Sequence, residues 1–201
     1  MIYLYAILVG FAAGSIPFGY LTGRIFYRSD IREQGSGNIG AMNALRSFGT
    51  AGAVAVLVLD ALKGFVPAFF GVLYYSDSVA SVTAAAAVLG HCFSPWLRGR
   101  GGKGVATSFG AILALNPYAG LIAILGWIAG ALTTGYSSVG SLFGSILAPI
   151  ALFLFSGGST AETLYGILAL VLIVFTHREN IVRLRHNTEN PIGLSRESNN
   201  S

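Results

Sequence analysis

The lysine and arginine residues of this 201-residue chain gather in three short islands separated by long apolar runs. Eleven of the twelve lie within residues 24–46, 98–103 and 178–196, and only Lys63 falls outside these ranges. Loops and helix ends on the cytoplasmic side of membrane proteins carry an excess of such residues. Only 10% of the chain is charged, whereas soluble domains have roughly 25%. The pattern therefore predicts an all-α integral membrane protein.

The apolar runs predict a seven-transmembrane-helix bundle, because a span needs about 20 apolar residues. The expected helices cover residues 2–23, 51–75, 79–93, 105–115, 118–134, 142–155 and 161–176. The third and fourth are short at about 1.5 Å per residue, so we expect the loop between them to dip below the membrane surface. Ser15-Ile16-Pro17 predicts a kink in the first helix.

Counting the spans predicts which side of the membrane each loop occupies. With the N-terminus outside, all three basic islands, the link at 135–141 and the C-terminus are cytoplasmic. The opposite turns carry only Asp77 and Glu162 as charges. We expect one membrane-embedded domain over residues 1–197, followed by a polar tail at 198–201. Because the basic residues flank apolar segments, the net charge of +4 does not indicate a nucleic-acid partner.

The first island combines glycines, short polar side chains and one arginine, namely Ser36, Gly37, Asn38, Asn43 and Arg46. Alternating glycines let backbone N–H groups converge on an anion, and a following helix adds its dipole. An arginine can pair with phosphate through two hydrogen bonds. This stretch is a candidate phosphate site, with a flexible loop of turn residues as the alternative.

The second island ends in Gly-Gly-Lys-Gly at residues 101–104, directly before an apolar run. It is not a nucleotide-binding P-loop, because Gly104 stands where Ser or Thr would follow the lysine. Gly101 and Gly102 still expose backbone N–H groups, and Lys103 adds a positive charge at a helix start. The alternative is an anchor for lipid headgroups.

Further polar residues lie near or inside the apolar runs. His177 and Asn180 are three apart and so share a helical face, which suits binding of a hydroxyl or phosphate oxygen or a plain capping role. Asp60 and Lys63 lie inside an apolar run, where a charge costs roughly 2.5–3.5 kcal/mol. We expect them to pair or to face a cavity. Ser141 lies near a helix start and is a candidate cap.

Several common catalytic patterns are missing from the sequence. It contains no Cys/His spacing for a metal and no Gly-x-Ser-x-Gly nucleophile motif. We therefore expect no metal, no cofactor and no covalent nucleophile.

Taken together, the three islands resemble the PlsY family of bacterial membrane acyl-phosphate:glycerol-3-phosphate acyltransferases. The residues that carry the resemblance run in order through nearly the whole chain: Gly35-Ser36-Gly37-Asn38 with Asn43, Leu59-Asp60 with Lys63-Gly64, Gly90-His91, the 101–107 segment, and His177-Arg178 with Asn180-Ile181 and Arg183-Leu184.

The resemblance implies an enzyme of the bacterial inner membrane that catalyses the first acylation of phospholipid biosynthesis. It would transfer a fatty acyl group from acyl phosphate to the 1-hydroxyl of glycerol 3-phosphate, with membrane lipid around it. Lysophosphatidic acid and phosphate would be the products. Catalytic positions would be Lys103, His177 and Asn180. Substrate-binding positions would be Ser36, Gly37, Asn38, Asn43, Arg46, Gly101, Gly102 and Ser141, with Asp60, Lys63, His91 and Arg183 in support.

Catalysis by orientation and charge stabilisation would suit such a substrate, because an acyl phosphate is already activated. The proton acceptor could be His177 or a substrate phosphate oxygen. The rival hypothesis is a membrane transporter of a small phosphorylated metabolite. Transporters, however, place their sites near the bilayer midplane, whereas these motifs gather on one face.

Overall fold

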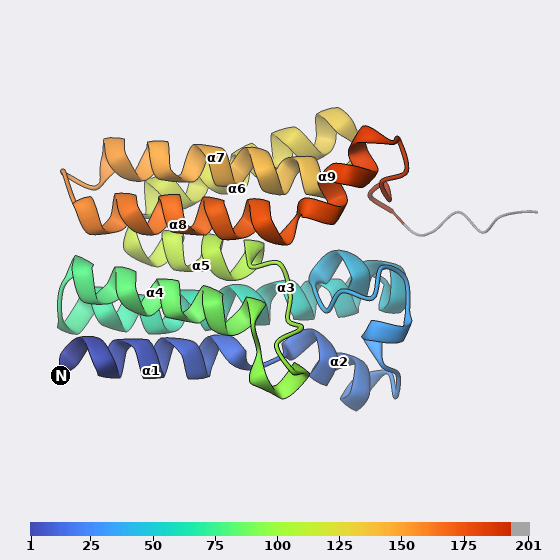
Figure 1. The fold of residues 1–201 in the computed structure, drawn as a ribbon, viewed down its shortest axis with the longest axis horizontal. Helices are drawn as coiled ribbons and strands as arrows, with labels where there is room; N and C mark the ends of the chain where they lie inside the picture. The colour runs from blue at the N-terminus through green and yellow to red at the C-terminus, as the bar shows by residue number, and fades with distance from the viewer. Residues whose placement is uncertain (194–201) are drawn as a thin grey trace, which may run out of the picture.

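The computed structural model describes residues 1–193, and over that range the chain is built from helices and turns with no β-strand (Figure 1). The main helices are α1 (Ile2–Ser15), α3 (Ala41–Tyr74), α4 (Asp77–Cys92), α5 (Val105–Leu115), α6 (Pro117–Thr134), α7 (Ser137–Phe155) and α8 (Thr160–Thr176). Shorter elements are α2 (Phe18–Phe26), α9 (Arg178–Arg185) and the 3-10 helices η1 (Ile31–Glu33) and η2 (Pro95–Leu97). The predicted tail at 198–201 lies outside the described residues.

The helices form an integral membrane bundle in which successive main helices run antiparallel (Figure 1). Within residues 1–193, five segments are long and apolar enough to span a bilayer: α1 with α2, α3, α4 with η2, α6 and α7. A sixth is obtained if α8 and α9 are taken as one bent span, and α5 is a shorter apolar helix. The membrane class is thus confirmed, while the count of seven spans stays a prediction.

The first predicted helix is interrupted completely rather than kinked. Helix α1 ends at Ser15 and α2 begins at Phe18, because Pro17 has no N–H group and cannot continue the hydrogen-bond ladder. Carbonyl groups freed in an apolar setting need other partners. The Ser15 carbonyl accepts a hydrogen bond from Ser94 Oγ at 2.6 Å, and the Ile16 carbonyl accepts one from Lys63 Nζ at 2.8 Å.

Two helix starts differ from the predicted ones. Helix α3 begins at Ala41 instead of residue 51, so Arg46 is helical, and Gly49 at φ 75° introduces a kink. Helix α7 begins at Ser137 instead of residue 142, with Tyr136 as its N-cap. Ser141 is therefore inside the helix and not a cap. Hydropathy placed both starts too late because the first turns of these helices are polar and precede the apolar runs.

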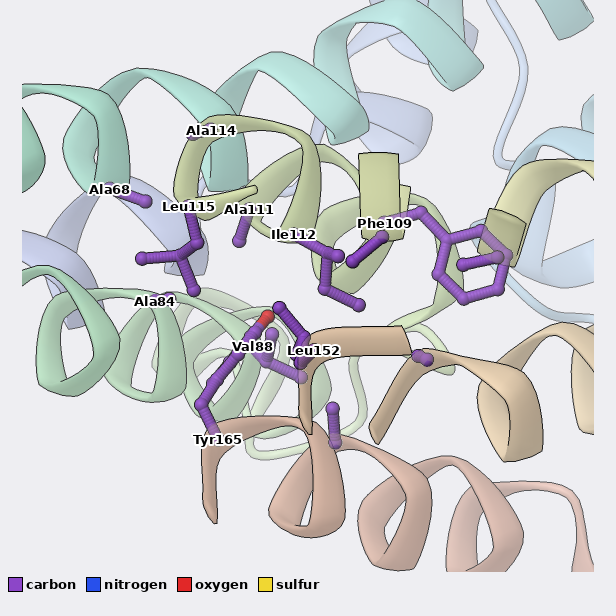
Figure 2. Packing of buried hydrophobic residues seen from close by; sticks show 14 of the residues in the cluster. Ala68, Ala84, Val88, Phe109, Ala111, Ile112, Ala114, Leu115, Leu152 and Tyr165 are labelled. Atoms are coloured by element: carbon purple, nitrogen blue, oxygen red, sulfur yellow. The ribbon is translucent and has the colours of Figure 1, made fainter. Parts of the chain in front are cut away.

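Helix α5 packs against buried residues of α3, α4, α7 and α8 (Figure 2). Its Ile112 packs in one buried cluster with Val88 of α4, Leu152 of α7 and Tyr165 of α8. Glycines bring α5 close to α3, since a Cβ on Gly110 would lie 2.8 Å from the Ala61 carbonyl carbon. An enclosed helix needs little length, which explains why 11 residues suffice.

The described parts of the three basic islands all lie at one end of the bundle, as predicted (Figure 1). Helices α2 and α9, η1 and the α6–α7 turn project at this end, and the loop between α4 and α5 is recessed behind them (Figure 1). The turns with Asp77 and Glu162 lie at the opposite end. Positive charge is therefore concentrated around a recess.

Candidate active site

A cavity of about 430 Å³ opens where the three islands meet. Its walls come from the segment around η1, the loop before α5 and helix α9. The lining residues are Asp30, Arg32, Glu33, Ser36, Gly37, Asn38, Arg100, Gly101, Lys103, Glu179 and Arg183. A hollow of about 450 Å³ at the opposite end is lined by Asp77 and by turn residues without a cationic side chain. The basic cavity is the one suited to a phosphate group.

Asn43 organises the glycine-rich loop that forms one wall. Its Nδ2 donates to the carbonyl groups of residues 31, 34 and 38 at 2.8–3.0 Å, and its Oδ1 accepts from the Ser36 N–H at 2.8 Å. A Cβ on Gly35, where φ is +53°, would overlap that Oδ1. The structure thus places Asn43 beneath the loop, 2% exposed, and presents Ser36 to the cavity.

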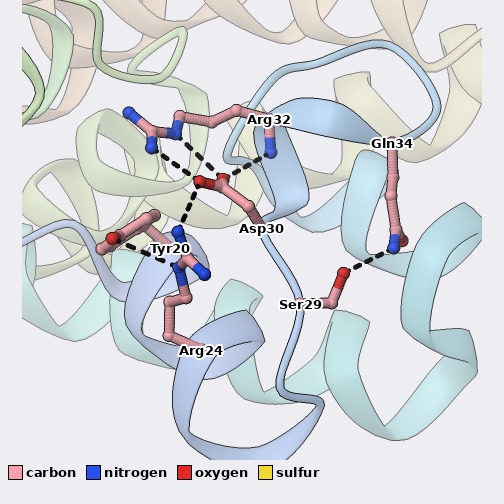
Figure 3. A network of polar contacts seen from close by, with 6 residues as sticks. All are labelled: Tyr20, Arg24, Ser29, Asp30, Arg32 and Gln34. Carbon is pink, nitrogen blue, oxygen red and sulfur yellow. Dashed lines mark hydrogen bonds and ion pairs between the residues drawn. The ribbon is translucent and has the colours of Figure 1, made fainter.

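A second network fixes the beginning of the same loop (Figure 3). Arg32 donates from Nε and Nη2 to the two carboxylate oxygens of Asp30, at 2.9 and 2.6 Å, and Arg24 adds a bond at 3.3 Å. The Arg32 guanidinium also lies over the Tyr20 ring at 4.8 Å. The Arg32 hydrogen bond holds the pKa of Asp30 at about 2, so this carboxylate stays charged and aligns Arg32 at the cavity.

Lys103 is linked to α9 and the segment after it through a chain of polar contacts. Its Nζ donates to Asn180 Oδ1, and Asn180 Nδ2 donates to Glu189 at 2.5 Å. Arg183 Nε donates to the other Glu189 oxygen at 2.7 Å. Thr176 Oγ1 holds the Lys103 carbonyl at 2.9 Å. The second and third islands are thereby joined around the lysine.

Burial and neighbouring groups shift the pKa values of Lys103 and Glu189. Burial first, and then the neighbouring Arg183, lower the pKa of Lys103 to about 8. For Glu189, burial raises the pKa, but hydrogen bonds from Asn180 and Arg183 outweigh it and the net pKa is lowered. At neutral pH, Lys103 is therefore a cation and Glu189 an anion.

His177 lies just past the end of α8, where the chain bends by 57° into α9. Its Nδ1 is 2.8 Å from the Ile173 carbonyl, which can only accept, so Nδ1 carries the proton and Nε2 of the neutral ring is free to accept. Burial, followed by the Lys103 charge, lowers the pKa of His177 to about 4. The bend lies at His177 itself, which is the N-cap of α9, and the Ile181 N–H donates to its carbonyl at 2.9 Å, so His177 and Asn180 both belong to the first turn of α9.

Other predicted site residues lie around the cavity and not on its lining. Arg46 donates to the carbonyls of Pro191 at 2.9 Å and Asn190 at 3.4 Å. Ile192 N–H donates to the Gly135 carbonyl at 2.8 Å. The 189–192 segment therefore connects α3, α9 and the α6–α7 turn through hydrogen bonds.

Three more predicted positions lie inside or behind the walls. Ser141 is buried and donates to the Ser137 carbonyl at 2.9 Å. Asp60 and Lys63 form the expected buried ion pair at 2.8 Å. With His91, they lie behind the loop that contains Gly102.

Sequence reasoning did not assign seven residues of the site: Asp30, Arg32, Glu33, Arg100, Thr176, Glu179 and Glu189. A weak signal existed for two of them, because Asp30 precedes Arg32 by two residues, a spacing typical of a capped turn. Glu189 is an acid within a basic stretch, which indicates a partner in the fold. Thr176 gave no signal beyond its place at the end of an apolar run.

Comparisons with known proteins identify the family of this chain. The family model for glycerol-3-phosphate acyltransferase matches residues 4–187. The glycerol-3-phosphate acyltransferase of Pelagibacter ubique is 41% identical over 189 residues, covering 94% of this chain and 97% of that protein. A relative of the same name from Rhodopseudomonas palustris (strain BisB5) is 43% identical over 192 residues, covering 96% and 97%.

Solved structures of PlsY, an integral membrane glycerol 3-phosphate acyltransferase, share the fold. The glycerol 3-phosphate form superposes with a TM-score of 0.90 at 36% identity, covering 95% of this chain and 96% of that one. The lysophosphatidic acid form gives 0.87 at 35% identity, with 95% of each chain covered. The match over residues 4–187, the relatives and these structures show that the chain belongs to the glycerol-3-phosphate acyltransferase family that includes PlsY.

Proposed function

We propose that the protein transfers a fatty acyl group from acyl phosphate to the 1-hydroxyl of glycerol 3-phosphate, giving lysophosphatidic acid and inorganic phosphate. The observation that carries this proposal is that Ser36, Lys103 and Arg183 line the same cavity, beside glycine-rich backbone. Its volume of about 430 Å³ suits a small phosphate ester. The PlsY structures with glycerol 3-phosphate and lysophosphatidic acid support the same substrate and product.

The chemistry asks for orientation more than for a nucleophile from the protein. The 1-hydroxyl oxygen attacks the acyl carbonyl carbon, the bond from that carbon to the phosphate oxygen breaks, and phosphate leaves with the electron pair. Lys103 offsets the charge that develops, and the Ser36 hydroxyl and Arg183, which line the same cavity, add hydrogen-bond donors. Neutral His177 orients the hydroxyl or accepts its proton at Nε2, and a phosphate oxygen is the other acceptor.

The location of the site follows from the charge distribution. Positive residues face the cytoplasm in membrane proteins, and the islands lie at one end of the bundle (Figure 1). We therefore place the cavity on the cytoplasmic side of a bacterial inner membrane, with seven spans, the N-terminus outside and the C-terminus inside. One membrane-embedded domain would cover residues 1–197.

The first experiment identifies the acyl donor. Purified protein given glycerol 3-phosphate and palmitoyl phosphate should release phosphate and form lysophosphatidic acid, whereas palmitoyl-CoA should give no product. Transfer from palmitoyl-CoA instead would contradict the proposed donor. Uptake of labelled glycerol 3-phosphate into proteoliposomes, without acyl product, would support the transporter alternative.

The rate should also depend on the charge of Lys103. Its pKa of about 8 means that the cation is present below that pH and is lost as the pH rises through it. We therefore expect kcat/KM to fall above pH 8. In a Lys103→Arg variant, whose guanidinium stays charged throughout, any remaining activity should lack this alkaline decline. An unchanged decline would assign it to another group.

A further inference from the structure

The loop that carries Lys103 is fixed from behind by the end of α4. The Gly101 N–H donates to the Cys92 carbonyl at 3.0 Å, and the Gly102 N–H donates to the His91 carbonyl at 3.1 Å. The loop thus folds back on the last turn of α4, and its two glycines lie next to His91. The prediction that these two N–H groups are exposed to an anion is therefore wrong, because both donate to carbonyl groups of α4. Nothing in the proposed chemistry uses this histidine directly.

The His91 side chain occupies the space that a side chain at Gly102 would need. A Cβ added to Gly102 would overlap the imidazole Nε2 and lie 2.6 Å from Cε1. The φ angle of Gly102 is not in the left-handed region, so backbone strain does not demand a glycine there. The imidazole therefore determines how closely the backbone at Gly102 approaches α4.

A buried ion pair lies on the other side of the imidazole. His91 is 4% exposed, and its Nδ1 is 3.7 Å from Asp60 Oδ1. Asp60 pairs with Lys63 at 2.8 Å, and Lys63 also donates to the Ile16 carbonyl at the α1–α2 break. Helices α3 and α4 and the break therefore meet at this ring. Since buried ion pairs are costly in a membrane, they usually have a function.

We propose that His91 is a positioning residue for Lys103, with the buried Asp60–Lys63 pair behind its ring. The ring sets the place of the Gly102 backbone, and the adjacent Lys103 then extends to Asn180 and the cavity. This inference rests on the proposed function, in which Lys103 binds a substrate phosphate.

A double-mutant cycle tests the contact. Gly102→Ala should lower kcat/KM by about 10²-fold, the loss that a displacement of about 1 Å can cause. Removing the ring with His91→Ala should lower kcat/KM by less, about tenfold, because no added atom pushes the loop away from α4. The double variant should be close to His91→Ala alone, because the methyl group then has space.

The neighbouring glycine provides a matched control. A Cβ on Gly101 would overlap the His91 backbone carbonyl and lie 2.7 Å from the Cys92 carbonyl oxygen, so the obstacle is main chain. His91→Ala should therefore rescue Gly102→Ala and leave Gly101→Ala impaired. Losses that simply multiply for Gly102, or an equal rescue of both glycine variants, would overturn the proposal.

The Michaelis constants separate positioning from loss of folded protein, because KM does not depend on the amount of active enzyme. We expect His91→Ala to raise KM for at least one of the two phosphate-bearing substrates. If the glycine variants cannot be purified, wild-type KM values for both substrates in His91→Ala overturn the inference. A wild-type protein without acyl transfer would overturn the proposed function itself, whereas an active wild type without selective rescue overturns only the role of His91.

Discussion

Replacing Lys103 with methionine should lower kcat/KM by about 10²–10³-fold, the loss typical when one group that stabilises transition-state charge is removed. Methionine keeps an unbranched side chain of similar length, so the change isolates the charge. The Lys103 ammonium has one side-chain partner, Asn180, among residues 1–193, and its remaining hydrogens are available to a substrate phosphate. Steady-state kinetics with varied glycerol 3-phosphate and acyl phosphate measure the loss.

Lys103→Arg is the matched control, because it keeps the charge but changes its shape. It should retain more activity than Lys103→Met. Both variants should remain monodisperse in detergent, with similar thermal unfolding, because the backbone bonds from the loop to α4 and the Thr176 contact do not involve the Lys103 side chain. Near-normal turnover in Lys103→Met would rule out the assigned phosphate site.

The link between Lys103 and Glu189 explains why no carboxylate neutralises the lysine directly, so that its positive charge is available to a ligand. Asn180 stands between them, accepting from the lysine and donating to the carboxylate. A direct ion pair would satisfy both charges and weaken the attraction for phosphate. Arg183 instead pairs with Glu189 at 2.7 Å. The neutral amide thus fixes the lysine in place without neutralising it.

Local sequence patterns predicted the membrane class, most helices and the gathering of the basic islands at one end. Those features depend on hydropathy and charge within short stretches of the chain, and both can be determined from the sequence without knowing the fold. The loop residues Ser36 and Lys103 were predicted for the same reason, because glycines beside polar groups are a local signal. Both line the cavity.

Contacts between distant segments could not be predicted in the same way. The Asn43 side chain could in principle donate hydrogen bonds to a phosphate, but in the structure its amide bonds three loop carbonyls and one N–H group. The partnership of Lys103 and Glu189 through Asn180 spans the whole C-terminal half of the chain. The bend at His177 is marked by no proline or glycine in the sequence.

Removing the imidazole of His177 should lower kcat at saturating substrate by about 10²–10⁴-fold, the range for general acid–base groups. With a pKa of about 4, the ring is neutral at working pH, so Nε2 can accept a hydrogen bond from the hydroxyl. The same low pKa predicts no loss of kcat from this group between pH 8 and 5. Single-turnover and steady-state kinetics of His177→Ala test this.

Two amide variants separate the two ring nitrogens of His177. Asparagine places its amide nearer the Nδ1 position and can keep a donor toward Ile173, whereas glutamine places its amide nearer Nε2. If accepting a hydrogen bond from the hydroxyl is the main role, glutamine should retain more kcat than asparagine. If proton transfer is essential, kcat should fall to a similar extent in both variants. A His177→Ala variant with raised KM and unchanged kcat would exclude the histidine as base and leave a substrate phosphate oxygen as the proton acceptor.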